Sequence, residues 1–424
     1  MKRARIGILA AGVLCATALP GACSVYDESL LGSGGGGPDS STGCLHARWP
    51  DEPKNAPPGG DISFVTALTY FDFGEPYVAT DGGANHPYRD VGYDLDNTCT
   101  KIGPGDPRPE DPNLNQDNSC RNAGGPGFAG VVGDYKDGRD NGLAGLITRV
   151  KLSLQEFGTD AYLANIGTGK VSLLFGVSGY NGELNDDDVT GIIYSPAAFD
   201  SVPENAGKTP QFDGSDRWPI MEDSYVGENE AEPAHKSIRG YVTNGVLVAR
   251  TADLNLRLRI GISSQDVTDL QITFLQPFLT AKISKDERGL WQLTEGVIAG
   301  RWKTDDLFKE LSRFPNPDTY PDVPVDDPFF CTDSQLYPAV RGFICSLADI
   351  YSGPPGPGND CDSLSIGIAF NAIQAQLGPK VETDDRVNPC GVFNPADDDC
   401  AKWARGEPVP GAGQIEAGAG DGGS

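Results

Sequence analysis

Acidic and amide side chains gather in two stretches of the chain, and together they have the chemistry to bind a calcium ion. Asp94 and Asp96 lie in the first stretch, and Asp137, Asp140 and Asn141 lie in the second. Ca²⁺ takes roughly six to eight oxygen ligands from adaptable loops. The spacing is not that of an EF-hand, so the alternative is that Asp140 caps a helix and the other acids are solvated turn residues. We predict a Ca²⁺ site formed by these five residues.

Other motifs for chemistry are missing from the sequence, and we predict no catalytic residue. There is no H-E-x-x-H or C-x-x-C motif and there are only three histidines. Residues 125–130 match G-x-G-x-x-G, but they do not join a strand to a helix, so no dinucleotide site is expected. Paired carboxylates that hydrolyse a polysaccharide remain an alternative, because 60 acidic residues offer many pairs.

The first residues have the pattern of an export signal. Lys2, Arg3 and Arg5 precede an uncharged apolar run over residues 6–19, which is shorter than the roughly 20 residues of a membrane span. Residues 19–23 then resemble a bacterial lipobox, in which Cys23 is lipidated, although the pattern has Leu where this chain has Pro at position 20. We predict a signal peptide over residues 1–22 and a lipid on Cys23. The alternative is ordinary cleavage of the signal near residue 22.

Eight cysteines remain after residue 23, and an exported chain meets an oxidising compartment. Disulfides are therefore expected rather than a zinc site. Spacing does not decide the pairing, so we predict local pairs where the chain allows them. The expected bonds are Cys99–Cys120, Cys345–Cys361, Cys390–Cys400 and, by remainder, Cys44–Cys331.

The composition limits the partners of the protein. The 60 acidic residues outnumber 33 basic ones and give a formal charge of −27. Binding to nucleic acid requires clustered Lys and Arg, so no nucleic-acid partner is expected. The same charge disfavours electrostatic docking on anionic lipid.

Most of the segments that position these residues have a sequence pattern typical of β-strands. Apolar and polar residues alternate over residues 254–260 and again over 270–274 and 279–283, which predicts an antiparallel meander that ends near Trp302. Two further strands are expected over residues 62–73 and 364–376. Short helices are expected in four places: residues 140–154, 160–166, 304–311 and 336–350. We predict a mainly β protein, an antiparallel β-sandwich of jelly-roll or concanavalin-like type decorated by a few short helices. An α+β fold is the alternative.

The chain divides into an anchor, one domain and a tail. A flexible Gly-rich tether is expected over residues 23–59. A single β-sandwich domain follows over residues 60–378, with long loop insertions at 74–140 and 203–233. The polar, Gly-rich residues 379–424 are expected to form a tail.

Three stretches carry a resemblance. They are residues 22–31 with the Gly-rich tether, the turn over residues 137–141, and residues 296–302. With these features the chain resembles lipoproteins of myxobacteria and related Gram-negative bacteria. The resemblance implies location and architecture, and it implies no reaction.

These observations lead to one predicted function and one alternative. We predict an exported outer-membrane lipoprotein, held to the membrane through its N-terminal lipid and facing the periplasm or the cell surface. Its expected role is non-enzymatic binding or adhesion, with a glycan or another cell-surface partner. Trp218, Trp291 and Trp302 are candidate sugar-stacking residues, and the alternative for Trp291 and Trp302 is packing in the core or on the sheet surface. The alternative is a secreted polysaccharide hydrolase.

Overall fold

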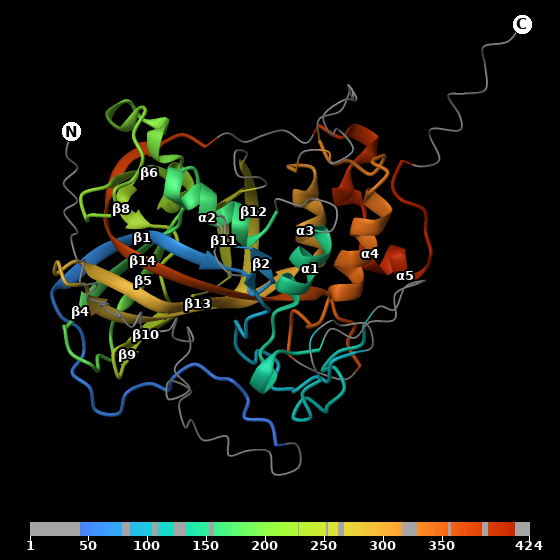
Figure 1. Ribbon diagram of the computed structural model, residues 1–424, viewed down its shortest axis with the longest axis horizontal. Coiled ribbons are helices and arrows are strands. Elements are labelled where there is room, and N and C mark those ends of the chain that lie inside the picture. Colours follow the sequence, from blue (N-terminus) through green and yellow to red (C-terminus); the bar gives the residue numbers. More distant parts are fainter. Residues whose placement is uncertain are drawn as a thin grey trace, which may run out of the picture.

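The fold is described from a computed structural model (Figure 1). It describes residues 43–78, 85–103, 108, 110–122, 133–151, 157–227, 229–251, 253–261, 267–314, 316, 329–354, 358–383 and 389–411.

Most of the described strands belong to one ten-stranded sheet. Neighbouring strands are antiparallel except for β6, which runs parallel to β14. The path through the sheet is β5-β4-β1-β14-β13-β12-β10-β9, with β11 paired to β12. The strands are β1 (Ile62–Asp72), β4 (Leu174–Tyr180), β5 (Thr190–Tyr194), β6 (Arg217–Met221), β9 (Arg239–Thr243), β10 (Val246–Arg250), β11 (Leu254–Gly261), β12 (Val267–Lys285), β13 (Trp291–Lys303) and β14 (Ser363–Val381). Two small hairpins pair β2 (Tyr77–Val78) with β3 (Asn85–His86) and β7 (Tyr225–Val226) with β8 (Asn229–Pro233).

The sheet curves until its two ends meet. The backbone N–H of Val189, just before β5, donates to the carbonyl of Gly240 in β9 at 3.1 Å. The N–H of Ser237 donates to the carbonyl of Gly191 at 2.8 Å. The halves of the sheet therefore face each other across an apolar core, and the expected mainly β class with a sandwich-type architecture is confirmed.

The predicted strands lie where their patterns placed them. The first and last long strands, β1 and β14, lie side by side and pair antiparallel. The meander is β11, β12 and β13. Pro277 does not end its strand, because β12 continues through it with a shift of register between Leu275 and Phe278. Such a bulge is how a strand tolerates a residue without a backbone N–H.

Five described helices accompany the sheet, and Figure 1 shows α1, α3, α4 and α5 at one end of it. They are α1 (Gly142–Lys151), α2 (Thr159–Thr168), α3 (Thr304–Leu311), α4 (Tyr337–Leu347) and α5 (Cys400–Ala404). The alternative in which Asp140 caps α1 is wrong by one residue. The side chain of Asn141, not that of Asp140, accepts from the backbone N–H of Ala144 at 3.3 Å.

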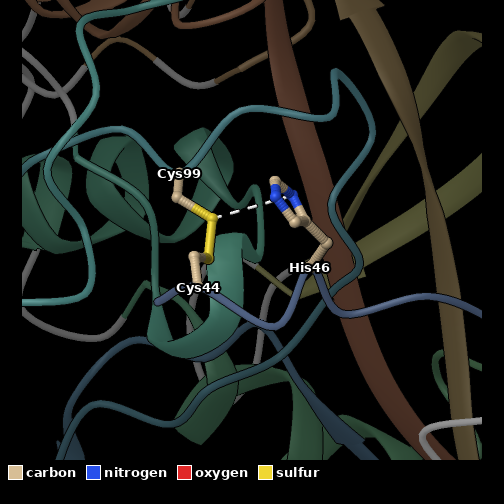
Figure 2. Close-up of side chains that lie close together, drawn as sticks. All are labelled: Cys44, His46 and Cys99. Atoms are coloured by element: carbon tan, nitrogen blue, oxygen red, sulfur yellow. Dashed lines mark hydrogen bonds between the residues drawn. A yellow bond between two sulfur atoms is a disulfide. The ribbon is translucent and has the colours of Figure 1, made fainter. Parts of the chain in front are cut away.

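All eight cysteines form disulfides, but each of the four expected pairs is wrong. The bonds are Cys44–Cys99 (Figure 2), Cys120–Cys361, Cys331–Cys390 and Cys345–Cys400. They close loops of 55 to 241 residues. Local pairing fails because the fold, not the distance along the chain, brings partners together: α4 carries Cys345 and faces α5, which begins with Cys400.

Parts of the predicted tether and tail fold onto the domain. Residues 43–59 are attached to the domain, since Cys44 is bonded to Cys99 and the N–H of Ala47 donates to the carbonyl of Asp137 at 2.7 Å. Residues 1–42, which hold the predicted signal peptide and Cys23, lie outside the described residues.

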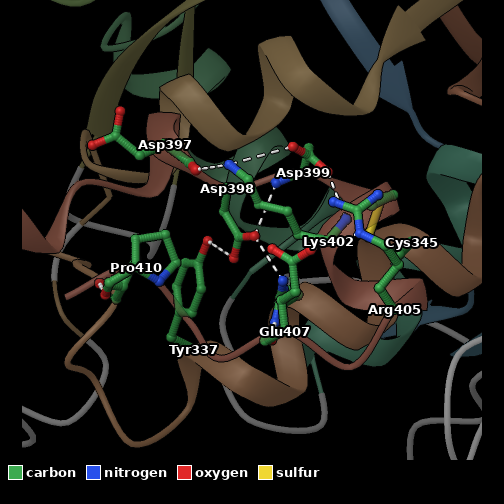
Figure 3. A network of polar contacts seen from close by, with 12 residues as sticks. Tyr337, Cys345, Asp397, Asp398, Asp399, Lys402, Arg405, Glu407 and Pro410 are labelled. Atoms are coloured by element: carbon green, nitrogen blue, oxygen red, sulfur yellow. Dashed lines mark hydrogen bonds and ion pairs between the residues drawn. A yellow bond between two sulfur atoms is a disulfide. The ribbon is translucent and has the colours of Figure 1, made fainter. Parts of the chain in front are cut away.

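At the other end of the chain, residues 389–411 fold against α4. Figure 3 shows the buried carboxylate of Asp398 beside Tyr337. It accepts from the Tyr337 hydroxyl at 3.1 Å and from the Arg341 guanidinium at 2.8 Å. The domain therefore extends past the expected boundary at residue 378.

Candidate functional site

Three of the five predicted calcium ligands converge in the interior. One carboxylate oxygen from each of Asp94, Asp96 and Asp140 lies within 4.8 Å of the other two. Their residues are 4%, 5% and 2% exposed. We call these three residues the carboxylate cluster. A surface turn would leave such side chains in water, so the alternative that they are only solvated turn residues does not describe them.

A tight turn delivers the first two members of the carboxylate cluster. The backbone N–H of Asn97 donates to Asp94 at 2.5 Å, and the N–H of Thr98 donates to Asp96 at 2.9 Å. Asn97 has a φ of 63°, the left-handed conformation that Asn tolerates better than most residues. The Ser119 hydroxyl donates to the second oxygen of Asp96. These bonds fix both carboxylates and leave lone pairs on their oxygens.

The third member arrives from the segment that leads into α1. The N–H of Asp140 donates to the carbonyl of Tyr93 at 3.0 Å, and its carboxylate accepts from the N–H of Leu95 at 2.6 Å. Gly92 makes this approach possible. Its φ is 121°, and a Cβ there would lie 2.6 Å from the carbonyl oxygen of Asp140. The two acidic stretches are thus joined backbone to backbone.

Two more buried carboxyls stand near the carboxylate cluster, and neither was among the predicted ligands. Asp134 accepts from the N–H of Thr100 at 2.6 Å and is 4% exposed. Asp349 accepts from the N–H of Ser365 at 2.8 Å and also from its hydroxyl. Asp134 lies in an acidic stretch that was visible in the sequence. Asp349 follows α4, more than 200 residues along the chain, and carries no local signal.

The other two predicted ligands have structural roles instead. Asp137 lies 3.4 Å from the guanidinium of Arg139, with which it forms a buried ion pair. Asn141 uses both ends of its amide: it donates to the carbonyl of Phe73 at 2.9 Å and accepts from the N–H of Gly367 at 3.1 Å. It also caps α1, and it is therefore part of the fold rather than of the carboxylate cluster.

Burial governs the protonation of these acids. It raises the pKa of Asp94 to about 6, an effect that the hydrogen bond from His46 opposes and the charge of Asp96 increases. Burial also raises the pKa of Asp96. It holds the pKa of Asp134 and of Asp140 well above the usual range, and the charge of Asp96 adds to both shifts. Several negative charges in one interior repel, so bound protons or a bound cation would stabilise the carboxylate cluster.

His46 connects the carboxylate cluster to a disulfide. Its Nδ1 lies 2.5 Å from Asp94 and 3.7 Å from the Sγ of Cys99. Figure 2 shows the ring turned toward the Cys44–Cys99 bond. The residue has a φ of 53°, which is uncommon outside glycine. The disulfide and this turn together hold the start of the described chain against Asp94.

The donor set of the carboxylate cluster fits a hard cation. Carboxylate oxygens with adaptable backbone around them are what Ca²⁺ prefers, whereas zinc takes nitrogen and sulfur ligands. Cys44, His46 and Cys99 also lie together, but their two sulfurs are bonded to each other and are not thiolates.

The predicted sugar-stacking residues are mostly inside the protein. Trp218 and Trp302 are buried. Trp291 is half-buried and stacks on Phe64, with ring centroids 4.8 Å apart. Lys285 lies over the Trp291 ring at 4.3 Å.

Comparisons with family models, curated proteins and solved structures found no match. No helix in the described part of the chain is long and apolar enough to cross a membrane.

Proposed function

We propose that this protein is an exported, lipid-anchored binding module without enzymatic activity, whose acidic loops are organised by one Ca²⁺ ion. The observation that carries the proposal is the convergence of Asp94, Asp96 and Asp140 within 4.8 Å in the interior. An ion there would join the two stretches of chain that supply its ligands.

Charge explains why a cation suits this position. Two unit charges about 4 Å apart repel by roughly 4 kcal/mol at an effective dielectric constant of about 20. Arg301 lies close enough to lower the pKa of Asp96, but it also donates to the carbonyl of Leu95 at 2.8 Å and is one charge among several acids. A divalent cation would offset the remaining repulsion. Asp94, Asp96 and Asp140 would hold it, and backbone carbonyls and water would complete its coordination.

Export is supported by the cysteines and the N-terminal sequence. Four disulfides are typical of proteins that fold outside the reducing cytosol. The charged start, the apolar run and Cys23 have the pattern of a lipoprotein signal. A lipid on Cys23 would fix the domain to the outer membrane and leave its acidic surface in solution.

A glycan or another cell-surface partner remains a prediction from the sequence. The burial of Trp218 and Trp302 removes two residues that prompted the carbohydrate hypothesis. The carboxylate cluster does not favour the alternative of a polysaccharide hydrolase, because a polymer would not reach side chains that are 5% exposed or less.

Thermal unfolding of the Asp96→Asn variant tests the Ca²⁺ proposal. For the unmodified protein, a Ca²⁺ concentration about 100 times the dissociation constant should add about 2.7 kcal/mol to the free energy of unfolding. Asp96→Asn removes one anionic ligand and should abolish most of this gain. Asp188→Asn is the matched control, because Asp188 is an exposed acid outside the carboxylate cluster. A melting temperature that is the same in Ca²⁺ and in chelator would refute the proposal.

A further inference from the structure

An apolar cavity lies between the helices and the sheet, away from the carboxylate cluster. Its volume is about 100 Å³. The sheet side of its wall comes from β11, β12, β13 and β14, and the helical side from α1, α3 and α4. Figure 1 shows these three helices at one end of the molecule.

The wall of this cavity offers almost nothing polar. Its lining side chains are Phe, Leu, Ile, Val and Ala, together with Trp302. The indole N–H of Trp302 has no hydrogen-bond partner among the described residues. A water molecule needs about two to four polar partners, so such a space stays dry and instead accepts apolar molecules. An engineered apolar cavity of about 150 Å³ in another protein takes benzene, so this one has room for on the order of four to six carbon atoms.

One side of the cavity reaches the surface between α1 and α4. Ala339 on α4 is exposed, and Val340 and Phe343 are only partly buried. Val150 at the end of α1 is also partly buried. A hydrocarbon chain can therefore enter at this mouth while the rest of its molecule remains in water.

A positive charge stands at the mouth. The guanidinium of Arg149 on α1 lies 5.9 Å from the ring centroid of Phe343. Two other cations near these helices are neutralised: Lys151 lies 3.2 Å from Asp160, and Arg313 lies 2.7 Å from Glu310. Arg149 forms no ion pair within the described part of the chain. Such a cation beside an apolar opening is suited to an anionic head group.

We propose that this cavity binds the end of a medium-chain fatty acid, with the carboxylate of the ligand near Arg149. The apolar wall excludes a polar tail, and the volume limits how many carbons enter. The charge at the mouth selects a carboxylate over the corresponding alcohol. The inference goes beyond the Ca²⁺ proposal and does not depend on it.

Fluorescence quenching by 8-bromooctanoate, whose chain length matches the cavity, tests the proposal on the full protein. Bromine bound inside the cavity should quench Trp302, and the Trp302→Phe variant should lose that quenching. The titration is done in chelator, so that failure of the Ca²⁺ proposal leaves the outcome unaffected. Absence of saturable quenching below the concentration at which micelles form would overturn the proposal.

Two variants separate the apolar and charged parts of the site. Arg149→Glu changes only the mouth and should weaken octanoate about tenfold, since an attraction becomes a repulsion. Octanol, which carries no charge, should be affected less than about twofold in this variant. Leu146→Phe fills the cavity and should weaken both ligands, with circular dichroism as the check on folding. Equal loss of both ligands in Arg149→Glu, or full binding in a folded Leu146→Phe variant, would contradict the inference. So would purification of the protein with a phospholipid in place of a fatty acid.

Discussion

Single residues in this protein have properties that their neighbours in sequence do not predict. The sequence grouped five residues as calcium ligands, and three of them meet. Asp137 and Asn141 lie in the same stretch as Asp140, but each finds another partner, Arg139 in one case and backbone groups in the other. Asp349 joins the neighbourhood from a distant segment. Spacing identifies which oxygens are near one another along a loop, whereas burial and tertiary contacts decide which of them face a common point.

The raised pKa values predict that stability in the absence of Ca²⁺ falls as pH rises. Burial raises the pKa of Asp94 and of Asp349 to about 6, so the folded state holds their protons more tightly than the unfolded chain does. The contribution of these two carboxyls to the free energy of unfolding is complete below the unfolded pKa of about 3.9. It is lost as pH rises through about 6. Each carboxyl loses roughly 3 kcal/mol of its contribution to the free energy of unfolding over this range.

Urea denaturation in chelator from pH 4.5 to 7.5 measures this effect. Added Ca²⁺ should restore stability at pH 7.5 and should have little effect at pH 4.5, where protons occupy the carboxylates. A free energy of unfolding in chelator that rises over this interval would contradict the expected sign.

Among the secondary-structure elements, periodic sequence patterns predicted the main strands and helices. Contacts between distant segments could not be predicted from such patterns. The meander, the paired terminal strands and the helices follow from apolar spacing. Alternation also placed Arg257 on a water-facing side, but it is 6% exposed and pairs with Asp223 at 2.8 Å. The predicted disulfide pairs were wrong because disulfide bonds, too, depend on contacts between distant segments. Their partners meet only when α4, α5 and the loops pack, and no local pattern records that meeting.

The ion pair beneath the C-terminal segment should hold that segment in place. Asp398→Ala would leave the buried guanidinium of Arg341 without its carboxylate, which typically costs about 3–5 kcal/mol. The exposed Asp397 provides the control, since Asp397→Ala changes a neighbouring acid outside this contact. Chemical denaturation compares the two. Equal stability of both variants would show that Asp398 contributes little.

At the scale of the whole molecule, the curved sheet holds the two candidate sites at opposite ends of one helix. Asp140, a member of the carboxylate cluster, and Asn141 lie directly before the first residue of α1. Arg149 and Val150 lie in the last turn of α1, at the mouth of the apolar cavity. The sequence predicted the class of this fold and an acidic site. It did not predict the cavity, because residues from distant strands and helices form its wall.

The N-terminal sequence predicts that the protein is attached to the membrane through Cys23. Metabolic labelling with a fatty acid should mark the unmodified protein and leave Cys23→Ala unlabelled. Cys23→Ser is a second variant with a side chain closer in shape, and it should behave like Cys23→Ala. A label that persists on either variant would show that Cys23 is not the anchor.

Equilibrium dialysis with radioactive Ca²⁺ tests for the proposed ion itself, because it counts bound Ca²⁺ without relying on the stability of the protein. The unmodified protein should bind one Ca²⁺ per chain with saturation. Asp140→Asn should lose that ion, and Asp188→Asn should keep it. An Asp140→Asn variant that binds as much Ca²⁺ as the unmodified protein, or an unmodified protein that binds none, would contradict the account.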